Sequence, residues 1–153
     1  MAAYFFDTSA LVKRYVNEQG STWVAATIDP TAGARVYVAS ITGVEVISAI
    51  ARKLKGNHVS ASDAVKATFR FHYDFANEYR IVSISDSVIN RSMMLAEAYA
   101  LRGYDAVQLG AALEINGRRM TFGAIPLILV TSDTELLTAA ITENLLTDDP
   151  NLH

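Results

Sequence analysis

The sequence contains no cysteine among its 153 residues. This absence excludes disulfide bonds and every metal site built on thiolates, such as structural zinc and iron–sulfur centres. The three histidines show no spacing typical of metal ligands; they are His58, His72 and His153. Any bound metal must therefore be held mainly by oxygen atoms, which favours Mg²⁺ or Mn²⁺ over zinc or copper.

Long hydrophobic runs are also absent. The longest run, from Ala124 to Val130, contains Pro126 and is too short to span a bilayer. The N-terminal segment has no basic region and meets an acid at Asp7, which is unlike a signal peptide. We therefore expect a cytoplasmic protein that is not associated with a membrane.

Neither sign of charge dominates the sequence. Charged residues make up 19% of the chain and the formal net charge is −3, which argues against a broad, nonspecific nucleic-acid coat. A nuclease whose acids are gathered in one pocket remains compatible with this balance. Apolar residues make up 51%, so residues 1–153 can bury the core of a single domain.

Short apolar runs alternate with longer amphipathic stretches. We expect strands at Ala2–Phe6, Arg35–Ser40, Arg80–Ile84, Ile125–Thr131 and Leu145–Thr147. We expect helices at Ser9–Asn17, Ser21–Ile28, Val44–Lys55, Ser60–Asn77, Ser87–Leu101, Asp105–Asn116 and Glu135–Glu143, with Gly103 as the stop signal after the fifth. This alternation predicts an α/β fold with a mostly parallel sheet and helices on both faces.

Four acids fall at positions that such a fold brings together. Asp7 and Asp133 follow apolar strands directly, Glu45 lies early in the helix after the second strand, and Asp105 opens a helix. In open α/β sheets, ligands bind outside the carboxyl ends of the strands. Gathered carboxylates repel one another, and a divalent cation removes that cost. Such a cation can also activate a water and stabilise the leaving oxygen of a phosphodiester.

Each acid also has a purely structural explanation. Asp7 and Asp133 fit helix N-caps. Two segments match capping boxes: Thr42-Gly-Val-Glu45 and Ser132-Asp-Thr-Glu135. Asp86 repeats the pattern of strand, acid and helix. Spacing alone therefore leaves the metal site open.

Three segments resemble the motifs of PIN-domain proteins. The first is Asp7-Thr-Ser-Ala-Leu-Val-Lys-Arg-Tyr15, the second is Leu101-Arg-Gly-Tyr-Asp-Ala-Val-Gln-Leu-Gly-Ala-Ala112, and the third is Leu129-Val-Thr-Ser-Asp-Thr-Glu-Leu-Leu137. Glu45 lies where that family carries a helix glutamate. The motifs occur in family order, and the resemblance covers nearly the whole chain.

The resemblance implies a three-layer α/β/α PIN-like fold and cleavage of RNA that depends on Mg²⁺ or Mn²⁺. It makes Asp7, Glu45, Asp105 and Asp133 the catalytic, metal-binding acids. Thr8 or Ser9, together with Thr131, become polar supports for those ligands. The branch that looks most similar is the VapC-type toxins of toxin–antitoxin pairs, which implies a homodimer held inactive by a cognate antitoxin.

Cations near these motifs are possible RNA contacts. Lys13 and Arg14 follow Asp7 on its helix, and Arg52 and Lys53 lie on the helix of Glu45. Each could bind a phosphate at the rim of the pocket. The alternative for each is a solvated position near the end of a helix.

Two other function classes are considered. A PIN fold that binds RNA or protein without cutting it is disfavoured by the presence of all four acids. A receiver domain or an aspartate-nucleophile phosphatase would need further acids beside Asp7, where the chain has Thr8 and Ser9.

Overall fold

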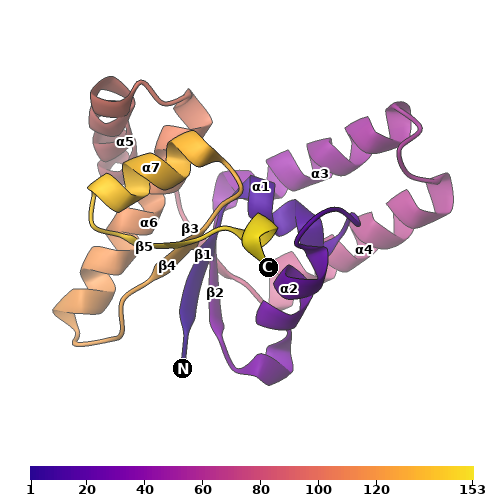
Figure 1. Cartoon of the computed structure of the whole chain (residues 1–153), viewed down its shortest axis with the longest axis horizontal. Helices are drawn as coiled ribbons and strands as arrows, with labels where there is room; N and C mark the ends of the chain where they lie inside the picture. The colour runs from indigo at the N-terminus through magenta and orange to yellow at the C-terminus, as the bar shows by residue number, and fades with distance from the viewer.

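The computed structural model describes residues 1–153 and consists of a five-stranded parallel sheet between two layers of helices (Figure 1). The strands are β1 (Ala3–Phe6), β2 (Arg35–Ala39), β3 (Arg80–Val82), β4 (Ile128–Val130) and β5 (Leu146–Asp148). The helices are α1 (Thr8–Leu11), α2 (Ser21–Thr27), α3 (Ser40–Lys55), α4 (Ala61–Asn77), α5 (Asp86–Tyr99), α6 (Gly103–Thr121) and α7 (Thr134–Thr142), with short 3₁₀ turns η1 (Val12–Arg14), η2 (Pro30–Ala32) and η3 (Pro150–Leu152). The expected three-layer α/β/α architecture is confirmed.

The strand order β3-β2-β1-β4-β5 places the first strand at the centre of the sheet. The chain builds outward from β1 to β3 on one side and then returns to add β4 and β5 on the other. The order therefore reverses beside β1, which is where open α/β sheets form a ligand crevice. The backbone N–H of Asp7 donates to the carbonyl of Val130 (3.1 Å), so the ends of β1 and β4 lie side by side.

The central strand contributes to two hydrophobic cores, one on each face of the sheet. Phe5 packs with residues of α5, α6 and α7, whereas the next side chain, Phe6, packs with residues of α1, α3 and α4. Both side chains are fully buried. Consecutive side chains of a strand point to opposite faces, so an uninterrupted apolar run is what a strand covered on both sides requires. None of the helices is both long and apolar enough to cross a membrane.

The capping-box interpretation of Thr42 is wrong. Helix α3 begins at Ser40, four residues before the expected start at Val44, so Thr42 lies inside its first turn. The Thr42 side chain is completely buried and accepts a hydrogen bond from the amide of Gln108 (2.8 Å). A tertiary contact with α6 has replaced the local cap. The second capping box is also wrong, because Asp133 rather than Ser132 caps α7.

The boundaries of three further helices differ from the prediction. Helix α6 extends from Gly103 to Thr121, five residues beyond the expected end at Asn116. Helix α5 ends at Tyr99, and Ala100 supplies the left-handed residue (φ 52°), so Gly103 is free to begin α6 instead of stopping the helix before it. The helix expected over Ser9–Asn17 is shorter, because α1 tightens into η1 and ends at Arg14.

Helices α5 and α6 pack closely at Gly110. A Cβ atom added there would lie 2.3 Å from the Ser92 hydroxyl oxygen and 3.3 Å from the carbonyl of Val88, to which that hydroxyl donates (2.7 Å). We expect Gly110→Ala to lower the free energy of unfolding by about 1–2 kcal/mol, although alanine is the better helix former. In the double variant with Ser92→Ala, most of that loss should be recovered, because the closest obstacle is gone. Urea denaturation of the four proteins measures this coupling, and purely additive effects would contradict the close contact.

Candidate active site

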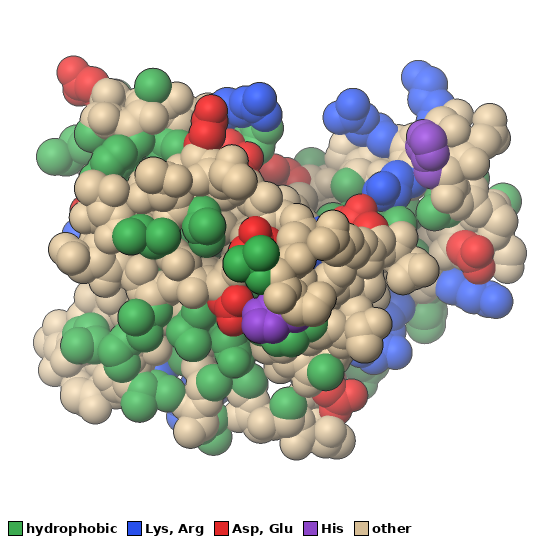
Figure 2. All heavy atoms as spheres, viewed as in Figure 1, with side chains coloured by type: hydrophobic (Ala, Val, Ile, Leu, Met, Phe, Trp, Pro, Cys, Tyr) green, Lys and Arg blue, Asp and Glu red, His purple; other side chains and the backbone are tan.

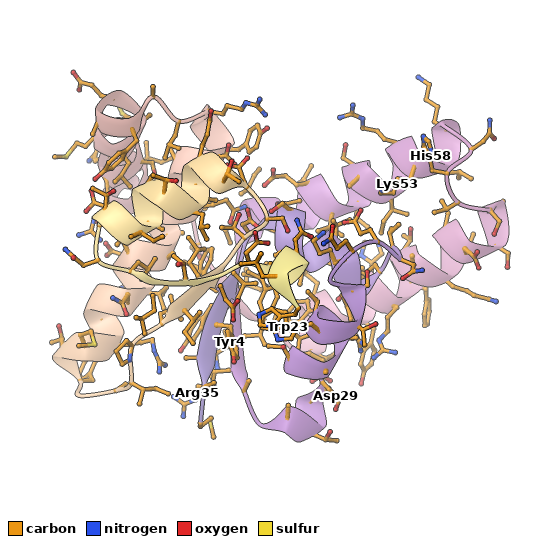
Figure 3. All side chains as sticks on the ribbon, in the orientation of Figure 1. Tyr4, Trp23, Asp29, Arg35, Lys53 and His58 are labelled. Atoms are coloured by element: carbon orange, nitrogen blue, oxygen red, sulfur yellow. The ribbon has the colours of Figure 1, made fainter.

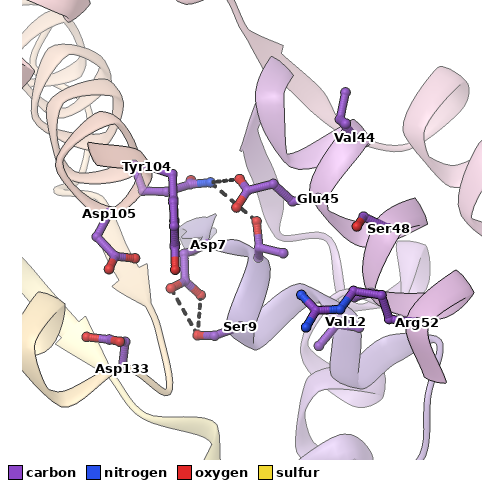
Figure 4. A pocket seen from close by; sticks show the side chains of 13 residues that line it. Asp7, Ser9, Val12, Val44, Glu45, Ser48, Arg52, Tyr104, Asp105 and Asp133 are labelled. Carbon is purple, nitrogen blue, oxygen red and sulfur yellow. Dashed lines mark hydrogen bonds between the residues drawn. The ribbon is translucent and has the colours of Figure 1, made fainter. Parts of the chain in front are cut away.

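A cavity of about 500 Å³ opens at the carboxyl ends of the central strands (Figure 4). Asp7 reaches it from the end of β1, Asp133 from the end of β4, Glu45 from α3 and Asp105 from α6. Four segments that are far apart in the sequence thus place a carboxylate around one cavity. This is the edge of the sheet at which the sequence predicted that these acids would gather.

Asp7 is the most tightly held of the four acids. Only 2% of the residue is exposed, and its carboxylate accepts hydrogen bonds from the hydroxyl of Thr131 (2.6 Å), the hydroxyl of Ser9 (2.8 Å) and the backbone N–H of Ala10 (2.9 Å). Asp7 is therefore both the N-cap of α1 and a fixed wall of the cavity. Thr8 lies differently: it lines the cavity without contacting this carboxylate, and its hydroxyl faces the amide of Gln108 (3.4 Å).

The environment of Asp7 disfavours its charge. Burial raises the pKa of the Asp7 carboxyl from 3.8 to about 6, and the nearby charge of Asp105 adds to the increase. The hydrogen bonds from Thr131, Ala10 and Ser9 act in the opposite direction but do not cancel the cost of burial. Asp7 is thus a buried acid that is partly protonated near pH 6.

Asp105 has a similar environment. Burial raises its pKa from 3.8 to about 6, with further increases from the charges of Asp133 and Glu45, while Arg102 opposes the shift. Asp133 is half-buried, and as the N-cap of α7 it accepts a hydrogen bond from the backbone N–H of Leu136 (2.8 Å). Asp105 is thus repelled by the carboxylates of Asp133 and Glu45, and it in turn raises the pKa of Asp7. Such strongly raised pKa values are typical of functional sites.

Two residues that line the cavity were missed in the sequence. Gln108 is 1% exposed, and its amide donates to Glu45 (3.1 Å) and Thr42 (2.8 Å). Tyr104 is half-exposed at the rim of the cavity (Figure 4). The signal available for Gln108 was its position three residues after Asp105, which puts both side chains on one face of a helix.

The structure separates the four predicted RNA-contacting cations. Arg52 lines the cavity of the four acids, whereas Arg14 lines a second cavity beside η1, α3 and α4. Lys53 pairs with Glu18 (3.6 Å). Lys13 pairs with the same carboxylate (3.5 Å) and is itself buried. Of the four, Arg52 is the one that the structure brings to the acids.

Asp86 lies away from this cavity. It is an exposed first residue of α5, and Ser85 before it is the N-cap. It follows β3, an edge strand that is separated from β1 by β2. The pattern of strand, acid and helix is thus shared with Asp7, but the position in the sheet is not.

The chain was compared with protein families, with individual proteins and with solved structures. The sequence model of the PIN domain matches residues 4–141. The chain is 34% identical over 116 residues to Ribonuclease VapC45 from Mycobacterium tuberculosis, an alignment that covers 75% of this chain and 78% of that protein. Among solved structures, FitAcB from Neisseria gonorrhoeae superposes with a TM-score of 0.65 at 15% identity, covering 96% and 97% of the two chains. A toxin–antitoxin complex from Klebsiella pneumoniae gives a TM-score of 0.55 at 21% identity, covering 86% and 87%. At these identities the two structures are similar in fold.

Proposed function

Since the chain belongs to the PIN-domain family, we propose that it is a metal-dependent ribonuclease that hydrolyses RNA phosphodiester bonds. The observation that carries this proposal is the convergence of Asp7, Glu45, Asp105 and Asp133 on one cavity. The 34% identical relative that is named a ribonuclease supports the substrate class. We further propose that the enzyme acts in the cytoplasm as the toxin of a toxin–antitoxin pair.

The donor set fits a hard divalent cation. All four acids offer oxygen ligands, and the chain contains no cysteine that could supply a thiolate. No three Asp, Glu or His side chains lie close enough together to coordinate one ion directly. The carboxylates instead surround a cavity of about 500 Å³, which suits Mg²⁺ or Mn²⁺ retaining several waters. Asp7, Asp105 and Asp133 would hold the ion, directly or through water, with Glu45 completing the set.

The side chains of this chain supply the rest of the chemistry. When bound, the cation would acidify a water and offset the charge of the scissile phosphate. Ser9 and Thr131 fix the Asp7 carboxylate through their hydroxyl groups. Glu45 uses its Oε1 atom to accept the hydrogen bond from Gln108, which leaves Oε2 to orient a water and to accept its proton.

RNA approaches, we propose, from the side of α3 and α4. Residues 8–77 contain eight Lys and Arg residues and five Asp and Glu residues. Residues 78–153 contain five Lys and Arg residues and ten Asp and Glu residues. The basic side chains gather around the projecting α3–α4 arm, where Lys53 and His58 are found (Figures 2 and 3). Arg52 at the cavity can bind a phosphate, and Tyr104 at the rim can stack on a base. Arg14, Lys53 and Lys13 would act further from the scissile bond.

A protein partner and a second subunit are further parts of this proposal. Exposed apolar side chains are found on two helices, Phe69 and Tyr73 on α4 and Ile89 and Met93 on α5. Each pair is spaced by four residues, so each forms one stripe along its helix. Such stripes are suited to an antitoxin and to homodimer formation.

Cleavage of a mixed RNA pool by the purified protein tests the enzymatic proposal. We expect cutting with Mn²⁺ and none with EDTA. Refolding from denaturant before the assay removes any co-purified antitoxin that would mask activity. If the refolded protein binds Mn²⁺ but cuts nothing, the narrower RNA target must be sought by using total cellular RNA. If it neither binds Mn²⁺ nor cuts, the alternative of an inert binding module is correct.

A further inference from the structure

Gln108 connects the helix of one acid to the helix of another. It lies on α6, three residues after Asp105, and is almost completely buried. Its amide nitrogen is 2.8 Å from the hydroxyl of Thr42 and 3.1 Å from Oε1 of Glu45, both on α3. A longer contact of 3.4 Å reaches the hydroxyl of Thr8 on α1. Three helices thus meet at one NH₂ group beside the cavity.

The Glu45 carboxylate has no other hydrogen-bonding partner in the protein. Asp7 is held by three donors and Asp133 by its helix-capping bond, but Glu45 receives a hydrogen bond from Gln108 alone. A glutamate side chain has three rotatable bonds, and α3 leaves this one half-exposed. Without the amide, the carboxylate would be free to turn towards solvent. Figure 4 shows it turned inward, across the cavity from Asp105 and Asp133.

The orientation of the amide carries a cost. Because an ionised carboxylate only accepts hydrogen bonds, the NH₂ group of Gln108 must face Glu45. The carbonyl oxygen of Gln108 is then buried without any partner. Such an orphaned buried group is destabilising, and a structural role would be served better by a fully paired side chain. In this orientation the amide nitrogen of Gln108 donates to Glu45, while its carbonyl oxygen accepts no hydrogen bond.

We propose that Gln108 is a positioning residue that holds the Glu45 carboxylate over the cavity. This inference rests on the proposed nuclease function, in which Glu45 orients the attacking water. Gln108 itself does not touch the reacting atoms. Residues that orient an active-site carboxylate in this way typically contribute 10–100-fold to activity.

The test combines Gln108→Met with Glu45→Ala. Methionine matches the length and apolar stem of glutamine but cannot donate a hydrogen bond. We expect Gln108→Met to lower kcat about 10–100-fold with KM for RNA changed less than about threefold. In the Glu45→Ala background, the same substitution should have no further effect on kcat. A purely structural role would instead give losses that multiply, which would overturn the proposal.

Thr42→Val is the matched control. It removes the other strong partner of the same NH₂ group and leaves the bond to Glu45 in place. We expect its kcat to stay within about threefold of the wild-type value. An equal loss in Thr42→Val and Gln108→Met would show that packing between α3 and α6, rather than the orientation of Glu45, is what matters.

A crystal structure of metal-free Gln108→Met gives a readout that does not depend on activity. We expect the Glu45 side chain to leave the cavity while the backbone of α3 stays in place. An unchanged Glu45 side chain would overturn the proposal. If the wild-type protein cuts no RNA, the proposed function fails, whereas this structure still decides whether Gln108 positions Glu45.

Discussion

Replacing Asp7 by asparagine is expected to abolish RNA cleavage and, at the same time, to stabilise the metal-free protein. Loss of a carboxylate from the centre of the site should lower kcat at least about 100-fold, equivalent to roughly 3 kcal/mol of transition-state stabilisation. The substitution removes from the folded protein a buried carboxyl group whose pKa is raised to about 6. A shift of about two pH units corresponds to at most about 3 kcal/mol at neutral pH. We expect a net gain of about 1–2 kcal/mol, because asparagine accepts weaker hydrogen bonds from Ser9 and Thr131.

The fold should tolerate this change because the local role of Asp7 is kept. Asparagine is as good an N-cap as aspartate, and its carbonyl oxygen can accept the N–H of Ala10. The matched control is Asp86→Asn, which alters an exposed acid at the equivalent end of another strand. This control should leave kcat unchanged and should lower stability by no more than about 0.5 kcal/mol, the contribution of an acid in the first turn of a helix. Activity is measured with Mn²⁺ on an RNA pool, and stability by urea denaturation in EDTA. Wild-type cleavage by Asp7→Asn would contradict the assignment of the site.

The elements of this fold were predictable because their signals are local. The uninterrupted apolar run of β1 identifies a strand buried on both faces, and the acids that follow β1 and β4 lie at its switch point as expected. The predicted start of α3 is wrong because the Thr42 hydroxyl does not cap the helix. It accepts a hydrogen bond from Gln108, more than sixty residues away in the sequence. No local pattern contains that contact.

The side chains around the acids were harder to predict for the same reason. Lys13 appeared in the sequence as one more surface cation, yet it is buried against Glu18. The early change from α1 to the 3₁₀ turn η1 alters the direction in which residue 13 points. The role of Gln108 depends on three helices meeting. A sequence shows which residues can donate and accept hydrogen bonds, but only packing selects the pairs.

The second large effect is an unusual pH dependence of stability. The pKa values of Asp7 and Asp105 are both raised from 3.8 to about 6 in the folded protein. A carboxyl with a raised pKa binds more protons when folded, so stability is lost as the pH rises from the unfolded value towards the folded one. Between pH 5 and pH 7 we expect the metal-free protein to lose about 2 kcal/mol of unfolding free energy. Urea denaturation in EDTA at pH 5, 6 and 7 measures this loss.

A divalent cation should reverse this trend, because metal binding requires the ionised carboxylates. With Mn²⁺ at about 100 times its dissociation constant, binding adds about 2.7 kcal/mol, and this gain should be largest at pH 7. The double variant Asp7→Asn/Asp105→Asn carries neither titrating group. Its stability should be flat over this range and indifferent to Mn²⁺. If the wild-type protein in EDTA instead became more stable from pH 5 to pH 7, Asp7 and Asp105 would ionise without cost in the folded protein, and a bound cation would have no such cost to relieve. Burial, with repulsion added to it, makes the ionised carboxylates costly in the metal-free fold, and a bound cation would relieve that cost. Stability of the metal-free protein and metal binding should therefore move in opposite directions across these variants.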